Sequence, residues 1–332
     1  MPAPYSLEPP AAPFDPKAAP PDPATLEWVA CYGCGGSERR PFRSAQDDLG
    51  GKPGTFTFVT CATCGLVYQC PRIPLSRIAA YYDDEYVSHR HRADWGPFTR
   101  LYERAMSSHD RKKVELVRRH VALGPAAEVL DVGCGAGTFL HRVHEETGAK
   151  VTGVDFKDLR HLPWYRAIDA KLGLFYEQDL GRDRFDLITM WHFLEHDYDP
   201  RRSLAHARDL LRPGSGRLVI EVPRLDSASA RLFRGRWPGL QAPQHTVLFD
   251  KEQLLRFVRE ADLELVEHLP YGAFPAYFYL FTGAAFLFLR GRGLDLRRAV
   301  GPYFLGQALL APLLLLERRL NLAMQTVVCK RR

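Results

Sequence analysis

The sequence of 332 residues is notable first for features that are missing. Its N-terminus has no basic patch followed by an apolar run, so we expect no secretory signal. Its seven cysteines are an odd number, and four of them form two CxxC pairs. This usage argues against a disulfide framework and for a reducing compartment, which predicts a cytoplasmic protein. No internal repeat is visible.

The net charge is small, and the sequence features typical of nucleic-acid binding or methylation are missing. The net charge of +6 is mildly basic, which alone does not indicate nucleic acid. The sequence has no Asn/Asp-Pro-Pro-Tyr/Phe stretch of the amino-methylating type and no basic–aromatic groove. We therefore expect no nucleic-acid partner. Hydrophobic and charged contents of 46% and 25% are ordinary for a globular protein, and the length suggests about two domains.

Composition divides the chain into parts of different character. The first 24 residues contain nine prolines, which disfavour helix and sheet and predict a disordered tail. The further parts are a zinc-ribbon-like module at 25–75, a helical connector at 76–127, a core at 128–270 and 319–332, and an apolar helical insertion at 271–318. In the connector, Val114, Val117 and Val121 have the spacing of one helix face.

From Glu128 onward, apolar runs alternate with helical segments, which is typical of a buried parallel sheet. The predicted strands are 129–132, 151–155, 174–176, 185–190, 217–222, 263–266 and 324–329. Asp199 is a suitable N-cap and Pro200 a suitable first residue for a helix that Pro213-Gly214 ends. A second helix is expected at 251–261.

A glycine-rich turn follows the first of these strands. Gly133, Gly135 and Gly137 let the backbone approach a ligand closely where a helix begins. The spacing G-x-G-x-G lacks the third glycine position of the dinucleotide fingerprint. Asp131, just before the glycines, would repel a pyrophosphate but favour a cationic sulfonium. Asp155 ends the second strand, where a carboxylate can accept hydrogen bonds from ribose hydroxyls.

Residues 128–224 resemble class I S-adenosylmethionine (SAM)-dependent methyltransferases, in particular the branch of ubiquinone and menaquinone biosynthesis methyltransferases. The resemblance implies an α/β fold with a Rossmann-like, doubly wound, seven-stranded sheet whose last strand is antiparallel. It further implies that Asp131 and the three glycines bind the methionine part of SAM, Asp155 the ribose and Asp179 the adenine amino group. Asp179 is alternatively a turn residue.

The segment after the fourth predicted strand contains His192, Glu195 and His196, which offer acid–base chemistry near neutral pH. It resembles a stretch of the same branch that borders the methyl donor, and this adds Trp191 to the expected cofactor-binding residues. We expect Glu195 to hydrogen-bond loops. His245 resembles a histidine in a loop over the active site and is the first choice for contacting the substrate, the alternative being a loop histidine satisfied by backbone groups.

The two CxxC pairs are Cys31–Cys34 and Cys61–Cys64, each followed by a glycine. Four thiolates can provide a closed tetrahedral site for structural Zn²⁺, whereas a redox pair is the rival interpretation. The stretch 61–86 resembles zinc-bearing N-terminal domains of bacterial methyltransferases, including sugar C-methyltransferases.

The insertion contains seventeen uncharged residues at 273–289, which is short for the roughly 20 that span a bilayer. With the arginine-rich loop 290–298, it suggests helices lying on the inner membrane surface or covering a hydrophobic acceptor pocket. A packed lid or a dimer interface remains an alternative. The resulting hypothesis is a SAM-dependent methyltransferase for a small-molecule or lipid-linked acceptor of sugar, polyketide or isoprenoid type. A non-catalytic SAM-binding protein and an NAD-dependent dehydrogenase are the alternatives, and the acceptor atom and oligomeric state stay open.

Overall fold

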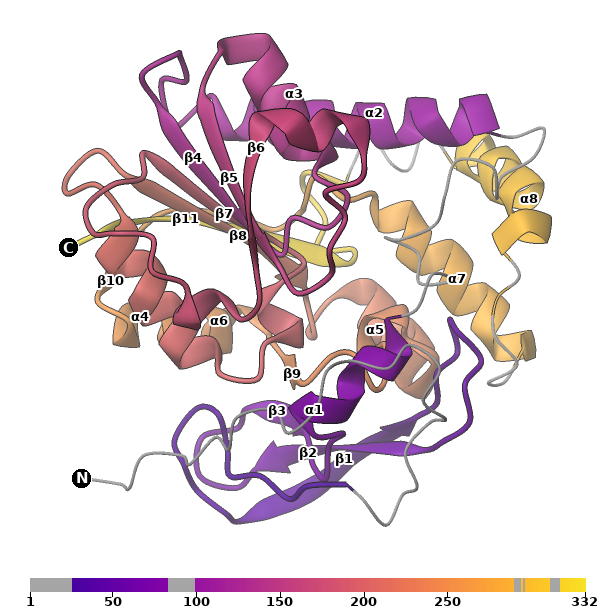
Figure 1. Cartoon of the computed structure of the whole chain (residues 1–332). Helices are drawn as coiled ribbons and strands as arrows, with labels where there is room; N and C mark the ends of the chain where they lie inside the picture. Colours follow the sequence, from indigo (N-terminus) through magenta and orange to yellow (C-terminus); the bar gives the residue numbers. More distant parts are fainter. Residues whose placement is uncertain (1–25, 83–98, 290–293, 295, 311–316) are drawn as a thin grey trace.

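A computed structural model describes residues 26–82, 99–289, 294, 296–310 and 317–332 of the chain (Figure 1). The predicted tail at 1–24 and most of the arginine-rich loop at 290–298 lie outside the described residues. The same holds for residues 83–98 of the helical connector.

The central element is a seven-stranded sheet in the order β10-β11-β8-β7-β4-β5-β6. The strands are β4 (Glu128–Val132), β5 (Lys150–Asp155), β6 (Ile168–Leu172), β7 (Leu187–Trp191), β8 (Arg217–Pro223), β10 (Leu263–Leu269) and β11 (Met324–Arg331). Neighbours pair in parallel except around β11, which is antiparallel to both β8 and β10. The predicted doubly wound sheet with an antiparallel last strand is therefore confirmed.

The prediction of the third strand is wrong. Residues 174–176 were expected to be a strand, but Phe175–Glu177 form the 3-10 helix η6 and the strand is β6, which ends before them. Within the described part of the chain, β6 is the edge of the sheet and pairs with β5 alone, so the polar residues Asp169 and Lys171 are tolerated within it. These charges remove the apolar run that marks buried strands, whereas Phe175 and Tyr176 are buried without being extended.

Helices cover both faces of the sheet (Figure 1). α2 (Thr99–Val117) and α3 (Thr138–Thr147) pack on one face, and α4 (Pro200–Leu210) and α6 (Lys251–Glu260) pack on the other. Asp199 caps α4, because its side chain accepts a hydrogen bond from the Arg202 N–H. α2 ends at Val117, so Val121 lies beyond the helix and not on its face, although it is buried in the same core as Val114.

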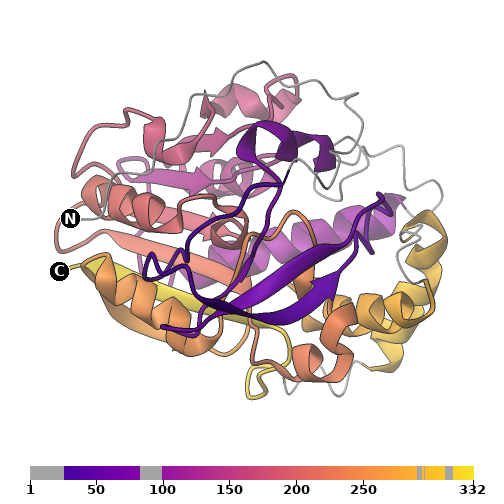
Figure 2. The same cartoon turned by 90° about the horizontal axis from the view of Figure 1, so that it is seen from below.

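The N-terminal module forms a second sheet with part of the core. β1 (Arg39–Ala45), β2 (Phe56–Cys61) and β3 (Val67–Gln69) form an antiparallel ladder that continues to β9 (Val247–Leu248). In this pairing Tyr68 lies opposite Val247, and the Gln69 N–H donates to the Thr246 carbonyl at 2.8 Å. Figure 2 shows these strands lying across the underside of the core. After β3 come the short helices α1 (Leu75–Ile78) and η2 (Ala79–Tyr81).

The insertion has two helices, α7 (Ala276–Leu289) and α8 (Leu296–Leu309). α7 packs against α5 (Ala228–Phe233) at Gly283, where a Cβ atom would clash with the Phe233 ring. α8 approaches α7 at Gly306, where a Cβ atom would clash with the Tyr277 hydroxyl. Among the helices in the described part of the chain, none is both long and apolar enough to cross a bilayer.

Candidate active site

The glycine turn has the backbone that its sequence predicts. Gly133, Gly135 and Gly137 have φ angles of 73°, 50° and 71°, a left-handed conformation that favours glycine. Gly133 packs against Phe193 and Gly137 against Tyr165, so a Cβ atom at either would lie within about 3 Å of a ring. Gly135 differs, since a Cβ atom there would meet no heavy atom within 4 Å. The backbone at Gly135 is thus the part of the turn that a ligand can approach.

Two aromatic residues that the sequence analysis missed support this turn from behind. Trp164 donates its indole N–H to the Ala136 carbonyl at 2.6 Å, and the Tyr165 hydroxyl donates to the Gly135 carbonyl. Both lie in the 3-10 helix η5 (Pro163–Ala167). These bonds fix the carbonyl groups of Gly135 and Ala136.

Asp155, at the end of β5, lies against the glycine turn as expected from its position. Its Oδ2 accepts from the Gly135 N–H at 2.8 Å and its Oδ1 accepts from the Lys157 N–H at 2.9 Å. A carboxylate offers about four acceptor positions and can therefore accept from several donors at once. Asp179 lies in an exposed turn after η6, where its Oδ1 accepts from the Gly181 N–H at 3.3 Å.

Asp131 and Trp191 are more deeply buried than their expected cofactor contacts suggest. Asp131 is 3% exposed, and its Oδ1 accepts from the Thr189 hydroxyl of β7 at 2.6 Å. Burial raises the pKa of Asp131 to about 7. Trp191 packs edge-on against Phe139 of α3, and Lys113 of α2 lies over its ring. Trp191 is thus part of the contact between β7 and the helices α2 and α3.

His192 lies between two buried carboxylates at the ends of β7 and β8. Its Nε2 is 3.3 Å from Glu221 Oε1 and its Nδ1 is 3.5 Å from Glu195 Oε1. Burial alone would lower the pKa of His192, but the two carboxylates raise it to about 9. His192 also has a φ of 54°, which is strained for a residue with a side chain, and its N–H donates to the Glu221 carbonyl.

Glu221 is a site residue that the sequence analysis missed. It is fully buried, and its carboxylate accepts from the N–H groups of Ala273 at 2.6 Å and Phe274 at 3.0 Å, just before α7. Burial alone would raise the pKa of Glu221, but His192 and these N–H groups lower it. Glu221 therefore connects the sheet to the start of the insertion.

His196 and His245 meet although they come from different segments. Their rings are 4.4 Å apart in an edge-on arrangement. His196 Nδ1 lies 2.8 Å from the Tyr82 hydroxyl, and His245 Nδ1 lies 2.8 Å from the Gly239 carbonyl. Burial lowers the pKa of both histidines, most strongly for His245. The structure thus brings the three predicted histidines to one edge of the sheet, with two of them neutral and His192 charged near pH 7.

Tyr82, which the sequence analysis also missed, connects these histidines to the glycine-turn side. Its ring packs edge-on against Phe156, which follows Asp155, with ring centres 5.1 Å apart. The same ring lies 6.0 Å from that of His196. No local pattern identifies Tyr82, because it belongs to the segment after the N-terminal module.

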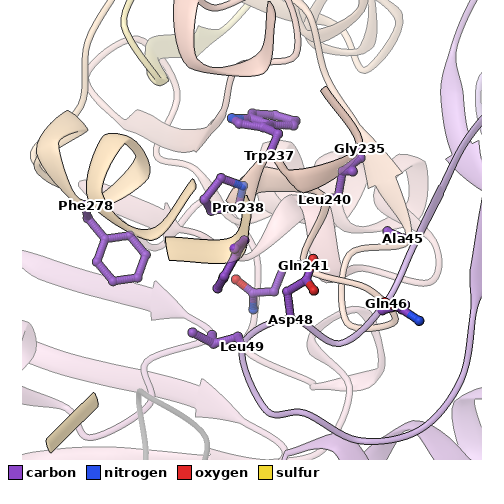
Figure 3. A pocket seen from close by; sticks show the side chains of 11 residues that line it. Ala45, Gln46, Asp48, Leu49, Gly235, Trp237, Pro238, Leu240, Gln241 and Phe278 are labelled. Atoms are coloured by element: carbon purple, nitrogen blue, oxygen red, sulfur yellow. The ribbon is translucent and has the colours of Figure 1, made fainter. Parts of the chain in front are cut away.

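A pocket lies between the N-terminal module, the segment after α5 and the insertion (Figure 3). Trp237, Pro238 and Leu240 from the η8–η9 segment (Arg234–Arg236 and Pro238–Leu240) line it together with Phe278 and Phe286 of α7. Leu49 and Asp48 contribute from the module. The pocket wall includes Pro238 and Leu240. Between them lies Gly239, whose carbonyl oxygen is hydrogen-bonded to His245 Nδ1.

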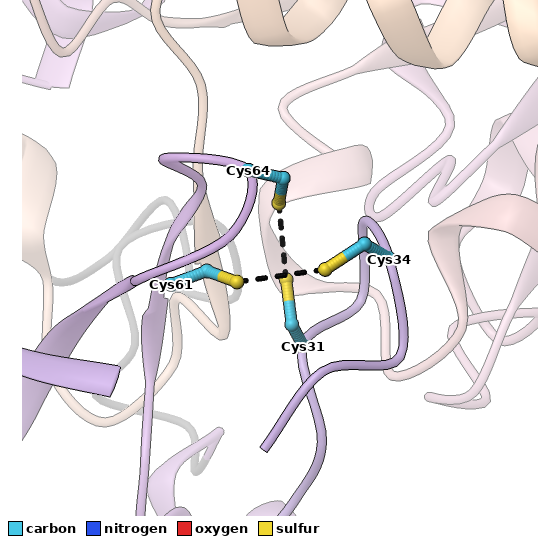
Figure 4. A group of neighbouring side chains, drawn as sticks. All are labelled: Cys31, Cys34, Cys61 and Cys64. Atoms are coloured by element: carbon cyan, nitrogen blue, oxygen red, sulfur yellow. Dashed lines mark hydrogen bonds between the residues drawn. The ribbon is translucent and has the colours of Figure 1, made fainter. Parts of the chain in front are cut away.

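The four predicted cysteine ligands lie together (Figure 4). The Sγ atoms of Cys31 and Cys64 are 3.5 Å apart, as are those of Cys34 and Cys61, and all four lie within 4.8 Å of one another. The glycines after each pair, Gly35 and Gly65, have φ angles of 73° and 76°. This is the tight turn that allows both cysteines of a pair to face one point.

The cysteine cluster also contacts the core through α4 and α6. The Arg256 guanidinium lies 3.4 Å from Cys64 Sγ, and Gln253 donates to the Cys64 carbonyl at 2.7 Å. Burial alone would raise the pKa of Cys64, but the Leu66 N–H and Arg256 lower it to about 7. From α4, Arg201 donates to the carbonyls of Tyr32 and Gly33.

Comparisons with known proteins connect this geometry to a family. A model described as a methyltransferase domain matches residues 98–268, just over half of the chain. Ubiquinone biosynthesis O-methyltransferase of Coxiella burnetii is 39% identical over 101 residues, covering 28% of this chain and 42% of that protein. The protein of the same name from Xanthomonas campestris pv. campestris is 31% identical over 126 residues, covering 36% and 52%. The chain thus spans about half the length of the curated relatives it matches.

Solved structures with a similar arrangement share little sequence. Geranyl diphosphate C-methyltransferase from Streptomyces coelicolor is 13% identical, with a TM-score of 0.45 over 66% of this chain and 78% of that one. A putative methyltransferase from Bacillus halodurans is 21% identical, with a TM-score of 0.41 over 47% and 70%.

The raised pKa of Asp131 predicts a pH dependence of stability. In protein purified without ligand, the folded state keeps a proton on Asp131 between the ordinary carboxyl pKa near 4 and about 7, where the unfolded chain has lost it. The free energy of unfolding should therefore fall as pH rises through this range, by up to about 1.4 kcal/mol per pH unit from this group. Asp131→Asn cannot ionise and should show a correspondingly weaker decline.

Urea unfolding of wild type and variant at pH 5, 6 and 7 measures this difference. Asp179→Asn, at an exposed carboxylate, is the control and should follow the wild type. Parallel pH profiles for wild type and Asp131→Asn would show that Asp131 is ionised throughout.

Proposed function

The chain belongs to the methyltransferase domain family, and on this basis we propose that it transfers a methyl group from SAM to a small-molecule or lipid-linked acceptor. The observation that carries the proposal is the glycine turn with Asp155 beside it. Gly135 leaves room where a side chain would stand, its N–H already bonds Asp155, and the turn opens α3. This suits a ligand with a ribose and a charged amino-acid part.

The residues present fit SAM in kind and in charge. The backbone of Gly133, Gly135 and Gly137 would hold its methionine part, Asp155 its ribose and Asp179 its adenine amino group. Asp131 would act with the glycines through its negative charge, since a cation nearby favours the ionised carboxylate. SAM supplies a methyl carbon that its sulfonium activates, so the protein mainly has to position the acceptor and exclude water.

We assign contact with the methyl acceptor to His245 and His196. Both rings are neutral near pH 7 because burial lowers their pKa, so either can accept a proton from an acceptor hydroxyl or amine. His192 instead keeps its proton, since its pKa is about 9. We assign it a positioning role between Glu195 and Glu221.

The pocket beside Gly239 supports an acceptor with an apolar part. The aromatic side chains of Trp237, Phe278 and Phe286 line it, and two of them belong to the insertion. We propose that α7 covers this part of the acceptor, which agrees with a polyketide or isoprenoid better than with a bare sugar.

Replacing Asp155 tests the cofactor site. Asp155→Ala removes hydrogen bonds to the ribose and to the Gly135 N–H, and charge-assisted bonds contribute about 1.5–3 kcal/mol each. We expect SAM affinity to fall at least about tenfold by calorimetry. Asp158→Ala is the matched control, because Asp158 is exposed and bonds Arg160. Wild-type protein that binds neither SAM nor S-adenosylhomocysteine would refute the proposal. Binding without release of S-adenosylhomocysteine in the presence of any acceptor would favour a non-catalytic SAM-binding protein.

We propose further that the cysteine cluster holds a structural Zn²⁺ ion. Four sulfur atoms at 3.5–4.8 Å from one another suit a closed tetrahedral site with Zn–S bonds of about 2.3 Å. The Arg256 guanidinium would offset part of the excess negative charge of four thiolates around one ion. A closed site leaves no position for a substrate, which favours a structural role.

Freshly purified protein should therefore contain zinc bound at this cluster. Cys61→Ser should lose that zinc and make residues 26–75 sensitive to proteolysis, because metal binding contributes the folding energy of such modules. Cys70→Ala is the matched control, since Cys70 is buried in the same module outside the cluster. Mass spectrometry measures the zinc content of the wild type and of the variants. A Cys61→Ser protein with undiminished zinc would exclude the cysteine cluster as the zinc site.

We propose finally that the insertion touches the inner membrane surface. Phe288, Leu309 and Leu305 are 85%, 72% and 65% exposed at its surface. Exposed apolar side chains on helices next to arginines are typical of interfacial binding to anionic lipids.

Sedimentation with anionic vesicles tests this contact. The double variant Phe288→Ser, Leu309→Ser should bind at least about tenfold more weakly, because each side chain contributes roughly 1.5–3 kcal/mol when it leaves water. Leu172→Ser on the edge strand β6 is the control and should bind as the wild type does. Wild-type protein that stays in the supernatant would refute the proposed membrane contact.

A further inference from the structure

Two arginines without acidic partners lie where β1 meets the end of α5. Arg43 Nη1 lies 3.5 Å from the Ala230 carbonyl of α5. Arg234, directly after α5, donates its backbone N–H to the same carbonyl. Among the residues that the structure describes, neither guanidinium forms an ion pair with a carboxylate. Two positive charges therefore stand near each other without a negative charge to balance them.

The electrostatics of this pair favour an anion. Burial lowers the pKa of Arg43, and the neighbouring Arg234 lowers it further. Like charges near each other repel, so the pair is unfavourable until an anion joins it. Arg236, two residues further on, differs because it forms an ion pair with Asp48 at 2.6 Å. An anion beside Arg43 and Arg234 would supply what Asp48 supplies to Arg236.

The backbone holds Arg234 in a conformation that suits glycine. Its φ of 49° and ψ of −115° belong to a region that residues with a Cβ atom rarely adopt. Strain of this kind gathers at functional sites, because a turn that served structure alone would be more stable with glycine. The arginine at this position therefore favours a function for its side chain.

The pocket of Figure 3 begins beside these arginines. Its lining includes Ala45, which is two residues after Arg43 and therefore on the same face of β1. The lining also includes Gly235, which directly follows Arg234. Three aromatic side chains belong to the same lining. A ligand in the pocket can thus have a charged end at the arginines and an apolar part against the aromatic rings.

We propose that Arg43 and Arg234 bind a phosphate group whose apolar substituent occupies this pocket. Two guanidinium groups match a phosphate monoester, with a charge of about −1.5 to −2 at pH 7, better than they match a carboxylate. The role of the ligand rests on the proposed function: it is the methyl acceptor, and it lies beside the wall in which Gly239 holds His245. The acceptor then belongs to the phosphorylated amphiphiles, such as alkyl or prenyl phosphates.

Calorimetric titration of the full-length chain with octyl phosphate tests the site. The wild type should bind octyl phosphate at least about tenfold more tightly than octanol or inorganic phosphate, because the arginines and the pocket then act together. Octanoate has an apolar chain of similar length and a single negative charge, so it should bind more weakly than octyl phosphate. The absence of saturable octyl phosphate binding overturns the proposal, and so does equal affinity for octanol or octanoate.

Variants assign the binding to the two arginines. Arg43→Gln and Arg234→Gly should each weaken octyl phosphate binding about tenfold, the loss expected for a charge-assisted hydrogen bond. Arg119→Gln removes the same charge from an exposed arginine just after α2 and should bind as the wild type does. Phe278→Ser should reduce the advantage of octyl phosphate over butyl phosphate, because Phe278 lines the pocket. Equal affinity in the wild type and both arginine variants overturns the anion site.

Thermal melts separate this role from a structural one. Arg234→Gly relieves the unfavourable φ, so this variant should melt at a higher temperature than the wild type while it binds octyl phosphate more weakly. A loss of stability together with the loss of binding in this variant would mean that Arg234 supports the fold, and it would overturn the assignment of Arg234 to the ligand.

Anionic lipid head groups also carry phosphate, and vesicles distinguish them from an acceptor. Sedimentation with anionic vesicles should give the same bound fraction for Arg43→Gln and Arg234→Gly as for Arg119→Gln. A selective loss of vesicle binding in the first two variants, without saturable binding of octyl phosphate, assigns the arginines to membrane lipid and overturns the acceptor site.

SAM affinity is measured on the same preparations. Protein that binds SAM but not octyl phosphate refutes the acceptor class and leaves the methyltransferase intact. Octyl phosphate binding in a protein without affinity for SAM supports the site and refutes the methyltransferase.

Discussion

The burial of carboxyl groups is the constraint on which this site depends. Asp131, Glu195 and Glu221 lie at or just beyond the carboxyl ends of three neighbouring strands, and each is at most 3% exposed. A buried carboxylate has to be matched by donors or by positive charge. The matching groups come from other segments: the Thr189 hydroxyl for Asp131, His192 for Glu195 and the N–H groups before α7 for Glu221. Satisfying these carboxyl groups therefore holds the sheet, the histidine segment and the insertion in one arrangement.

The parts of the site that local sequence determines could be predicted. Glycines at positions with positive φ follow a buried strand, and Asp155 ends the next one, so their meeting follows from the geometry of parallel strands. The cysteine pairs could be found in the same way, since each pair and its glycine form one tight turn. The place of His192 and His196 follows from the end of β7 in the same way, whereas the place of His245 was implied only by a resemblance, and no pattern predicts the protonation states of the three.

The rest depends on contacts between distant segments, for which the sequence holds no local signal. Trp164 and Tyr165 support the glycine turn, and Tyr82 reaches His196, only because the chain folds back. Asp131 was expected to offer a charge to a ligand, but its depth and its bond to Thr189 raise its pKa. The edge strand β6 was misplaced because its charged residues face solvent, where burial no longer selects for apolar side chains.

The pairing of β3 with β9 joins a strand that lies before the residues matched by the family model to a strand within them. The family match begins at residue 98, so it contains β9 but not β3. A strand of two residues has little stability alone, and the chain next to His245 takes its extended shape from a partner encoded before the match begins. The cysteine-bearing module is thus part of the same folding unit as the catalytic core. Recombination that exchanged one without the other would break the pairing of β3 with β9 beside His245, so the two have to be inherited together.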